Sequence, residues 1–304
     1  MRYVTPYVLA LTIVMYTHQA KGQGCSDAGF CTINALMPQG PETVETKQYN
    51  QVKFGLSNGK ADHDITIWSF YMEYSRSINK QFSIDTKLTG LSQNGSLTSA
   101  AGLSDIYLNA NYTGISNAFF TTGIKLPLTD GNKKKNGASL PMDYQSSLGT
   151  TDLILGIGYR IKKAELVIAW QQPLTQNNNA FLSTDHPGDP AFTQFQSTNK
   201  YVRKGDVLLR VSYPLILNEK WKLTPGILPI YHLSEDEFTD ASGKENTIAG
   251  SQGLTFNGNL FLDYSINKSS LVQLSFGTPF IARDVRPDGL TRKYVVTLEY
   301  RYRF

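Results

Sequence analysis

The sequence predicts an all-β chain that folds as a single transmembrane antiparallel β-barrel of about 12 strands, with short periplasmic turns and long external loops. Three features predict this fold: an export signal, strands in which apolar and polar residues alternate, and connections that alternate between short and long. Charged residues make up 18% of the chain, below the roughly 25% of average globular proteins, while Tyr and Phe number 17 and 15. Such a composition is expected when one face of each strand contacts lipid.

The N-terminus has the features of an exported protein. Arg2 supplies a positive start, and residues 7–16 supply an apolar stretch that is shorter than the roughly 20 residues needed to span a bilayer. Small residues at Ala20 and Gly22 predict a signal peptide over residues 1–22, with cleavage after Ala20 as the competing choice. An uncleaved N-terminal membrane anchor is the alternative.

We expect residues 23–45 to form a periplasmic N-terminal segment and residues 46–304 to form the outer-membrane barrel. Cys25 and Cys31 lie in the first of these segments, where an oxidising periplasm favours a small disulfide loop between them. A lipoprotein acylated at Cys25 is the alternative, although Gly22 stands three residues earlier where Leu is usual. Metal binding by a lone cysteine pair is less favoured.

The alternation is clearest at the C-terminus. Every second residue from Tyr294 to Phe304 is apolar or aromatic, and the residues between them are almost all polar. Successive side chains of a strand point to opposite faces, so one face of this strand suits lipid and the other suits water. A final Phe after such a strand resembles the C-terminal signature of bacterial outer-membrane proteins and predicts binding of Phe304 by the barrel-assembly machinery. A soluble β-sandwich is the alternative fold.

The same pattern recurs along the chain and defines the strands. Short turns at 77–80, 114–117, 162–163, 218–220 and 267–269 alternate with long polar stretches at 95–102, 129–147, 175–204, 234–251 and 284–291. This alternation predicts both termini in the periplasm and a barrel surrounded by the outer-membrane lipid of a Gram-negative bacterium. The predicted strands span residues 46–58, 64–76, 81–93, 103–114, 118–128, 148–161, 164–174, 205–217, 220–233, 252–266, 270–283 and 292–304.

The inward face of these strands carries charges of both signs, so no ion selectivity is predicted. They either line a path for a polar solute or form an ion-paired network that fills a narrow lumen. The candidate lumen-facing residues are Glu73, Asp85, Lys87, Asp105, Asp152, Arg160, Asp206, Arg210, Asp263, Glu299, Arg301 and Arg303.

The sequence predicts no enzyme, cofactor or nucleic-acid partner. A hydrolase of the barrel wall needs a Ser–His pair and an orienting polar residue, but only His232 ends a predicted strand, and no motif resembles those of outer-membrane phospholipases. No Gly-rich phosphate loop is present, and the acidic loop from Glu235 to Asp240 lacks the spacing of a Ca²⁺ loop. Basic residues are scattered rather than gathered on one face.

Three stretches resemble the bacterial outer-membrane barrels grouped as the phenol-degradation meta-pathway family. They are residues 102–106 (GLSDI), 122–131 (TGIKLPLTDG) and 148–152 (LGTTD), which approximate the family blocks G-L-G-D, G-x-K-L-P-T-G-D and G-T-G-S-x-D. Ser104 replaces a Gly, Leu128 is inserted before Thr129, and Thr151 replaces a Ser. The resemblance implies a transporter of small, hydrophobic compounds and brings no agreed catalytic residues with it.

The sequence therefore favours a narrow channel for a small solute, with the long loop 175–204 folding inward as a constriction. The alternative is a non-conducting structural or binding barrel with a side-chain-filled lumen, and a membrane hydrolase is the least favoured function.

Overall fold

The computed structural model describes residues 32–38, 50–289 and 292–304. The predicted signal peptide and the pair Cys25 and Cys31 lie outside these residues, so both stay predictions. Among the described residues, none of the helices has the length and apolar character that crossing a membrane would require.

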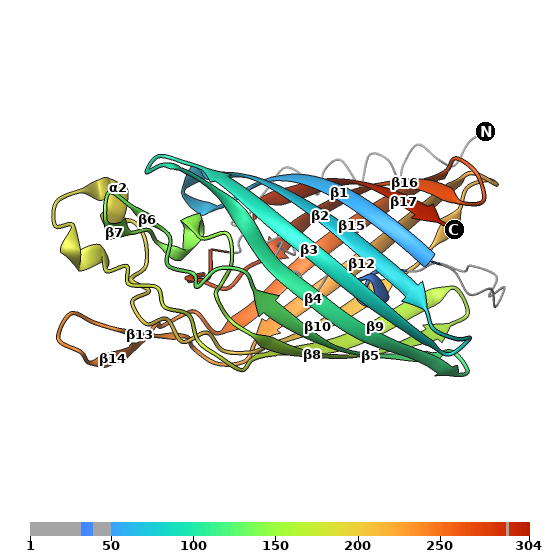
Figure 1. Cartoon of the computed structure of the whole chain (residues 1–304), viewed down its shortest axis with the longest axis horizontal. Coiled ribbons are helices and arrows are strands. Elements are labelled where there is room, and N and C mark those ends of the chain that lie inside the picture. Colours follow the sequence, from blue (N-terminus) through green and yellow to red (C-terminus); the bar gives the residue numbers. More distant parts are fainter. Residues whose placement is uncertain (1–31, 39–49, 290–291) are drawn as a thin grey trace, which may run out of the picture.

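Twelve antiparallel strands form one closed barrel, which confirms the predicted fold class (Figure 1). Each strand pairs with its neighbours in sequence, β1 pairs with β17, and β10 pairs with both β9 and β12, which leaves the barrel without an open edge. The barrel strands are β1 (Asn50–Lys60), β2 (Thr66–Ser77), β3 (Phe82–Asn94), β4 (Ser99–Ile115), β5 (Ala118–Pro127), β8 (Asp152–Ile161), β9 (Ala164–Pro173), β10 (Asp206–Ser212), β12 (Trp221–His232), β15 (Gly253–Ser265), β16 (Ser270–Ile281) and β17 (Tyr294–Arg303).

The remaining elements are short. A two-residue strand, β11, continues the line of β10 after Pro214, whose missing N–H interrupts the ladder. The other elements are β6 (Lys134–Lys135), β7 (Ala138–Ser139), β11 (Leu215–Ile216), β13 (Glu237–Thr239), β14 (Glu245–Thr247), α2 (Pro190–Thr193) and the 3-10 turns η3 (Asn34–Leu36), η4 (Asp62–Asp64), η5 (Met142–Tyr144) and η6 (Ser183–Asp185).

The predicted strand ends differ from the observed ones by a few residues at most, and the larger differences have local causes. Strand β4 begins at Ser99 because its hairpin with β3 stays paired up to Asn94 and Ser99. Strand β8 begins later than predicted because Gly149, with φ +70°, leaves the extended conformation and lies against the backbone of Asp130. A Cβ at Gly149 would come within 2.5 Å of that backbone.

The outer surface of the barrel is apolar. Leu56, Leu298 and Leu274 lie side by side on β1, β17 and β16, and all three side chains are about half exposed. The opposite face of the same strands carries buried polar groups such as Lys53 and Glu299. A single-layered sheet buries the face that it encloses, so the apolar face points outward, as lipid requires.

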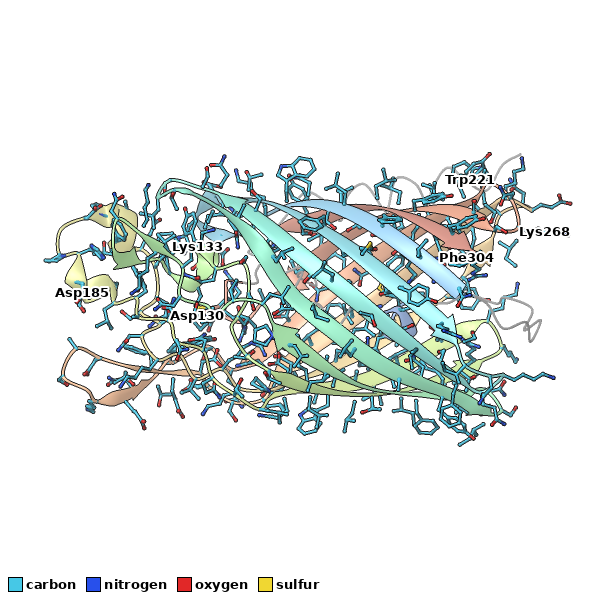
Figure 2. The ribbon with its side chains drawn as sticks, in the orientation of Figure 1. Asp130, Lys133, Asp185, Trp221, Lys268 and Phe304 are labelled. Carbon is cyan, nitrogen blue, oxygen red and sulfur yellow. The ribbon has the colours of Figure 1, made fainter. Side chains whose placement is uncertain are left out.

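Aromatic residues gather at the end of the barrel that carries the short turns. Trp221 packs on Tyr264 with ring centroids 4.6 Å apart, and Tyr302 stacks on Phe304 at 5.8 Å. Figure 2 shows Trp221, Lys268 and Phe304 at this end and Asp130, Lys133 and Asp185 at the loop end. Such a belt is typical of the interface between hydrocarbon and headgroups.

The last residue takes part in barrel closure. The backbone N–H of Asn50 donates to Phe304 O and the N–H of Phe304 donates to Asn50 O, both at 2.9 Å. Strand pairing therefore extends to the chain end, and the C-terminal strand is held along its whole length by β1 and β16.

The long loops build a packed cap over the external end. Phe181 and Phe195, from the connection between β9 and β10, are buried against Tyr144 of η5 and against Leu91 and Ala100 at the rims of β3 and β4. The ring of Phe195 lies 5.8 Å from that of Tyr144. The loop 175–204 therefore packs on the rim and on its neighbouring loop through apolar side chains.

We expect the outward position of Leu298 to be costly for a charge. Leu298→Arg places a cation near the middle of the apolar band and should lower the free energy of unfolding by about 2–4 kcal/mol, whereas an interfacial charge costs only about 0–1 kcal/mol. Ile266→Arg, at a periplasmic turn where the side chain is also about half exposed, is the matched control. Urea titration of the protein folded into lipid vesicles measures both, and equal costs would contradict the assigned membrane position.

Candidate functional site

The interior of the barrel contains the charges that the sequence assigns to the lumen. All are buried except Arg160 and Arg303, which are partly exposed at the periplasmic ends of β8 and β17. Asp85 accepts a hydrogen bond from Asn111 Nδ2 at 2.7 Å, and Asp105 accepts one from Ser147 Oγ at 2.6 Å. The inward-facing carboxylates are thus held by the wall itself.

Several of these charges form ion pairs, in four cases between neighbouring strands and in one case, Arg301 with Glu299, within β17. The cations Lys53, Lys125 and Lys222 were not among the sequence-predicted residues, although each stands at an inward position of the strand alternation. Lys125 and Asp152 are completely buried, and such a pair is stable only when both charges stay together. The pairs are Lys53–Glu73 at 3.0 Å, Lys125–Asp152 at 2.8 Å, Lys222–Asp263 at 2.8 Å, Arg160–Glu165 at 3.0 Å and Arg301–Glu299 at 2.9 Å.

Tyr71 reaches across β1 to join two strands that do not pair directly. Its hydroxyl donates to Glu299 of β17, and its ring passes over Gly55 of β1, where a Cβ would lie 2.1 Å from the ring. The Nζ atom of Lys87 lies over the Tyr71 ring, 4.2 Å from its centroid. A glycine at position 55 is therefore required for this arrangement.

Residues 32–38, here called the internal segment, lie inside the barrel. The sequence analysis places them in the periplasm, as part of segment 23–45. Lys53 Nζ donates to Asn34 Oδ1 at 2.6 Å, and Lys87 Nζ donates to Thr32 Oγ1 at 2.6 Å. On the opposite wall, Arg210 donates to Leu36 O at 2.7 Å. Charged residues of the lumen wall donate the hydrogen bonds that hold this segment. No local sequence pattern predicts its position inside the barrel.

The internal segment also fills an apolar region of the lumen. Ile33 and Leu36 are completely buried, and a Cβ at Gly156 would lie 2.6 Å from Leu36 Cδ2, so this glycine leaves room for the leucine. The wall residues that they contact form what we call the apolar strip, a run of inward side chains on consecutive strands from β4 to β12. The strip consists of Tyr107, Phe119, Ile154, Val167, Ala169, Leu208 and Leu228.

The other half of the lumen is polar and contains a cavity. Strands β1–β3 and β15–β17 supply most of its lining, and the internal segment contributes Thr32 and Met37. The cavity has a volume of about 70 Å³ and lies within an empty space of about 780 Å³ that includes open solvent. Its wall carries hydroxyl and amide groups beside two cations: Ser57, Ser69, Tyr71, Lys87, Thr89, Arg210, Asn259, Gln273, Ser275 and Thr297.

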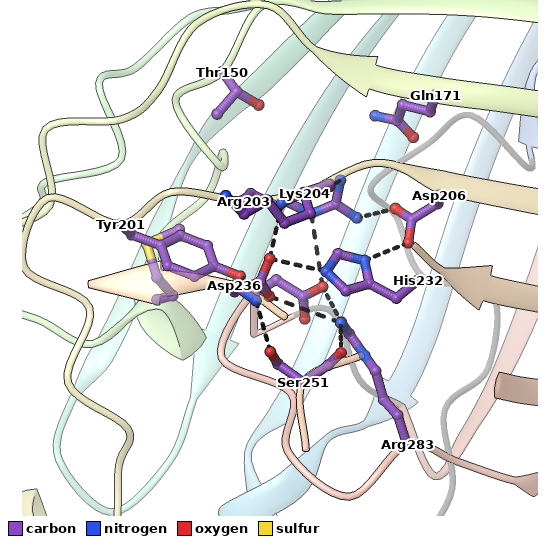
Figure 3. Close-up of polar contacts among 12 residues, drawn as sticks. Thr150, Gln171, Tyr201, Arg203, Lys204, Asp206, His232, Asp236, Ser251 and Arg283 are labelled. Carbon is purple, nitrogen blue, oxygen red and sulfur yellow. Dashed lines mark hydrogen bonds and ion pairs between the residues drawn. The ribbon is translucent and has the colours of Figure 1, made fainter. Parts of the chain in front are cut away.

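A second polar cluster, the rim network, lies at the external end (Figure 3). His232, the last residue of β12, places Nδ1 2.7 Å from Asp206 Oδ1 and Nε2 2.8 Å from Asp236 Oδ1. Arg203 pairs with Asp206, and Arg283 pairs with Asp288. The network joins the ends of β10 and β12 to the loops on either side, and so fixes the cap to the barrel.

The charges of the rim network balance only when His232 is an imidazolium. Three carboxylates then face two guanidinium groups and one imidazolium, and both ring nitrogens can donate. Burial alone raises the pKa of Asp288, but the guanidinium groups of Arg283 and Arg203 outweigh burial and hold it below its ordinary value. Both nitrogens of His232 face carboxylates, so this ring is not placed to activate a serine.

Asp143, in the cap, is held in a poorly solvated position. It lies in η5, against Gly289 of the loop between β16 and β17, where a Cβ would come within 2.7 Å of the Asp143 backbone. Burial, together with the neighbouring carboxylates of Asp62 and Asp288, raises the pKa of its carboxyl to about 7, against the opposing effects of its own backbone N–H and of the Arg292 charge.

The comparisons with known proteins concern the fold. No protein-family model matches this sequence, and no curated protein matches it. An outer-membrane channel from Pseudomonas putida F1 is similar in structure, with 13% identity, a TM-score of 0.58 and coverage of 84% of this chain and 96% of that chain. At such low identity the likeness shows a shared barrel fold.

Two further solved structures resemble the chain less closely. The CymD monoaromatic hydrocarbon channel has 8% identity and a TM-score of 0.46, with 95% of this chain and 99% of that chain covered. The KdgM porin has 9% identity and a TM-score of 0.45, with 84% and 99% covered. None of these comparisons bears on the phenol-degradation meta-pathway family itself.

We expect Asp143 to make the cap pH-sensitive. The folded cap favours the protonated carboxyl of Asp143, whose pKa is raised to about 7. The resulting stabilisation is complete below about pH 4, where the unfolded carboxyl is also protonated, and it is lost as the pH rises through about 7. Asp143→Asn should therefore slow proteolytic nicking of loop 128–151 severalfold at pH 8 and leave it unchanged at pH 4. Asp185→Asn, in another external loop, is the control, and an equal effect of Asp143→Asn at both pH values would contradict the assignment.

Proposed function

We propose that this protein is an outer-membrane channel for a small solute, closed in the present state by its own internal segment. The observation that supports this proposal is the way in which residues 32–38 are attached to the barrel wall. Residues 32–38 occupy the centre of the lumen, yet they belong to no barrel strand and are attached to the wall through side-chain hydrogen bonds and packed apolar side chains. A segment of this kind can leave without breaking the backbone ladder that keeps the barrel closed.

The wall is built to stay intact when the segment moves. The pairs Lys125–Asp152 and Lys222–Asp263 involve wall residues alone. Lys53 keeps Glu73 as a partner when Asn34 departs. These three wall pairs therefore stay together when the internal segment is displaced. Separating one of them would leave isolated buried charges, at a cost of several kcal/mol each.

The proposed setting follows from the fold and the outer surface. The apolar band with its aromatic belt suits outer-membrane lipid of a Gram-negative bacterium, and the C-terminal strand ending at Phe304 suits recognition by the barrel-assembly machinery. The sequence blocks around Asp105, Lys125 and Asp152 favour a solute of the kind implied by the phenol-degradation meta-pathway family, small and hydrophobic. The apolar strip supports such a solute, because it lines half the lumen.

A non-conducting barrel is the second candidate. The packed cap and the ion-paired wall favour it, because both reduce the free cross-section of the lumen. The two functions differ in what happens when the internal segment is removed, since only a channel gains a path.

We expect deletion of residues 32–38 to raise the single-channel conductance in planar bilayers severalfold, because the segment fills space between the two halves of the lumen. The wild-type protein should show a smaller or intermittent current. Heat-modifiable mobility on gels would check that the deletion variant still folds.

The matched point variant is Gly156→Val, whose added side chain takes the position of Leu36 and should raise conductance without shortening the chain. Val167→Ala, which removes bulk from the same strip, is its control. A folded deletion variant without any conductance at either polarity would contradict the channel and favour the non-conducting barrel.

A further inference from the structure

The contacts of the internal segment describe the chemistry of what the lumen binds. Three buried cations donate to its oxygens: Lys53 to the Asn34 side chain, Lys87 to the Thr32 hydroxyl and carbonyl, and Arg210 to the Leu36 carbonyl. The segment thus presents neutral acceptor oxygens to cations on two sides of the wall, Lys53 and Lys87 on β1 and β3 and Arg210 on β10.

The same segment also presents hydrocarbon to the wall. Ile33 and Leu36 contact the apolar strip, where Tyr107 and Phe119 are buried among aliphatic side chains. Acceptor oxygens and an apolar body are therefore combined over a few residues. They meet Lys53 and Lys87 on one side of the lumen, and hydrocarbon together with Arg210 on the other.

The cavity beside the segment has two of these cations in its lining. Lys87 and Arg210 both line it, and the remaining lining consists of hydroxyl, amide and apolar residues. No carboxylate is found among the described residues of this lining. Behind it, Glu165 lies near Arg210, Glu73 lies near Lys87, and Glu299 accepts the hydrogen bond of Tyr71. A negatively charged group in the cavity would meet two cations and several neutral donors.

Exchange of the segment for an anion is favourable on general grounds. A guanidinium binds a carboxylate through two parallel N–H···O bonds, which are roughly twice as strong as bonds between neutral partners. The internal segment offers Arg210 neutral acceptors instead, the carbonyl of Leu36 at 2.7 Å and the sulfur of Met37 at 3.1 Å. A cationic solute, in contrast, would be repelled by Lys53, Lys87 and Arg210 and would offer them no acceptor.

We propose that the lumen holds a binding site for a small amphipathic carboxylate, an aromatic or short-chain aliphatic acid in its anionic form, that takes the place of the internal segment. Its carboxylate binds Arg210 and Lys87, and its apolar body lies on the apolar strip vacated by Ile33 and Leu36. This site deepens the proposed channel function, on which it rests, by naming the class of solute that opens the lumen.

The test compares benzoate with its neutral isostere benzamide and with benzylamine, using calorimetric titration of the full chain in lipid nanodiscs. Benzoate should bind at least about tenfold more tightly than either, since a hydrogen bond to a charged group contributes about 1.5–3 kcal/mol. Deletion of residues 32–38 removes the competing segment and should tighten benzoate binding further. Equal affinity for benzoate and benzamide would overturn the proposal.

Variants locate the site. Arg210→Gln and Lys87→Met should each weaken benzoate binding about tenfold and leave benzamide unaffected, and Arg210→Lys should restore part of the loss. Arg76→Gln, which removes an exposed cation near a periplasmic turn, is the control and should change nothing. Two separate wall cations keep the test valid if one variant fails to fold, and unchanged benzoate affinity in both folded variants would overturn the proposal.

The outcomes separate this site from the channel function. A deletion variant that conducts while benzoate and benzamide bind alike leaves the channel standing and overturns the carboxylate site. A deletion variant that does not conduct, in a protein that binds benzoate through Arg210, supports the site and makes the protein a binding barrel.

Discussion

Pairing of backbone N–H and C=O groups in a hydrocarbon environment is the constraint on which the rest of this structure depends. Each unpaired group would cost several kcal/mol in lipid, so the sheet must close on itself. The chain closes it at β1 with β17, down to the mutual hydrogen bonds of Asn50 and Phe304. Closure then assigns one face of every strand to lipid and the other to a narrow enclosed space.

The enclosed space explains the charge pattern. A lumen bounded by twelve strands brings inward side chains of adjacent strands within contact distance, and buried charges must then be paired. Lys125 with Asp152 and Lys53 with Glu73 satisfy this requirement on neighbouring strands. These pairs do not depend on residues 32–38, so the centre of the lumen can hold a segment that is not part of the sheet.

The lumen is obstructed at two places, by the cap and by the internal segment, and different interactions hold the two. At the external end the cap is fixed by apolar packing around Phe181 and Phe195 and by the rim network around His232, so several loops must move together to open it. In the lumen, a few side-chain hydrogen bonds and two apolar side chains hold residues 32–38. The weaker attachment makes the internal segment the natural moving part, and a solute able to replace its contacts would shift the equilibrium toward its release.

The sequence by itself determined the strands, their alternation and the connection lengths, because a two-residue period and turn residues are local properties of the chain. It also identified the inward carboxylates Glu73, Asp152 and Glu299, but not their partners. Tertiary structure alone decided that Lys53 meets both Glu73 and Asn34, and that His232 lies between Asp206 and Asp236. These contacts depend on strand register and on loops that converge from distant parts of the sequence, and the place of residues 32–38 depends on a lumen that exists only after the barrel has closed.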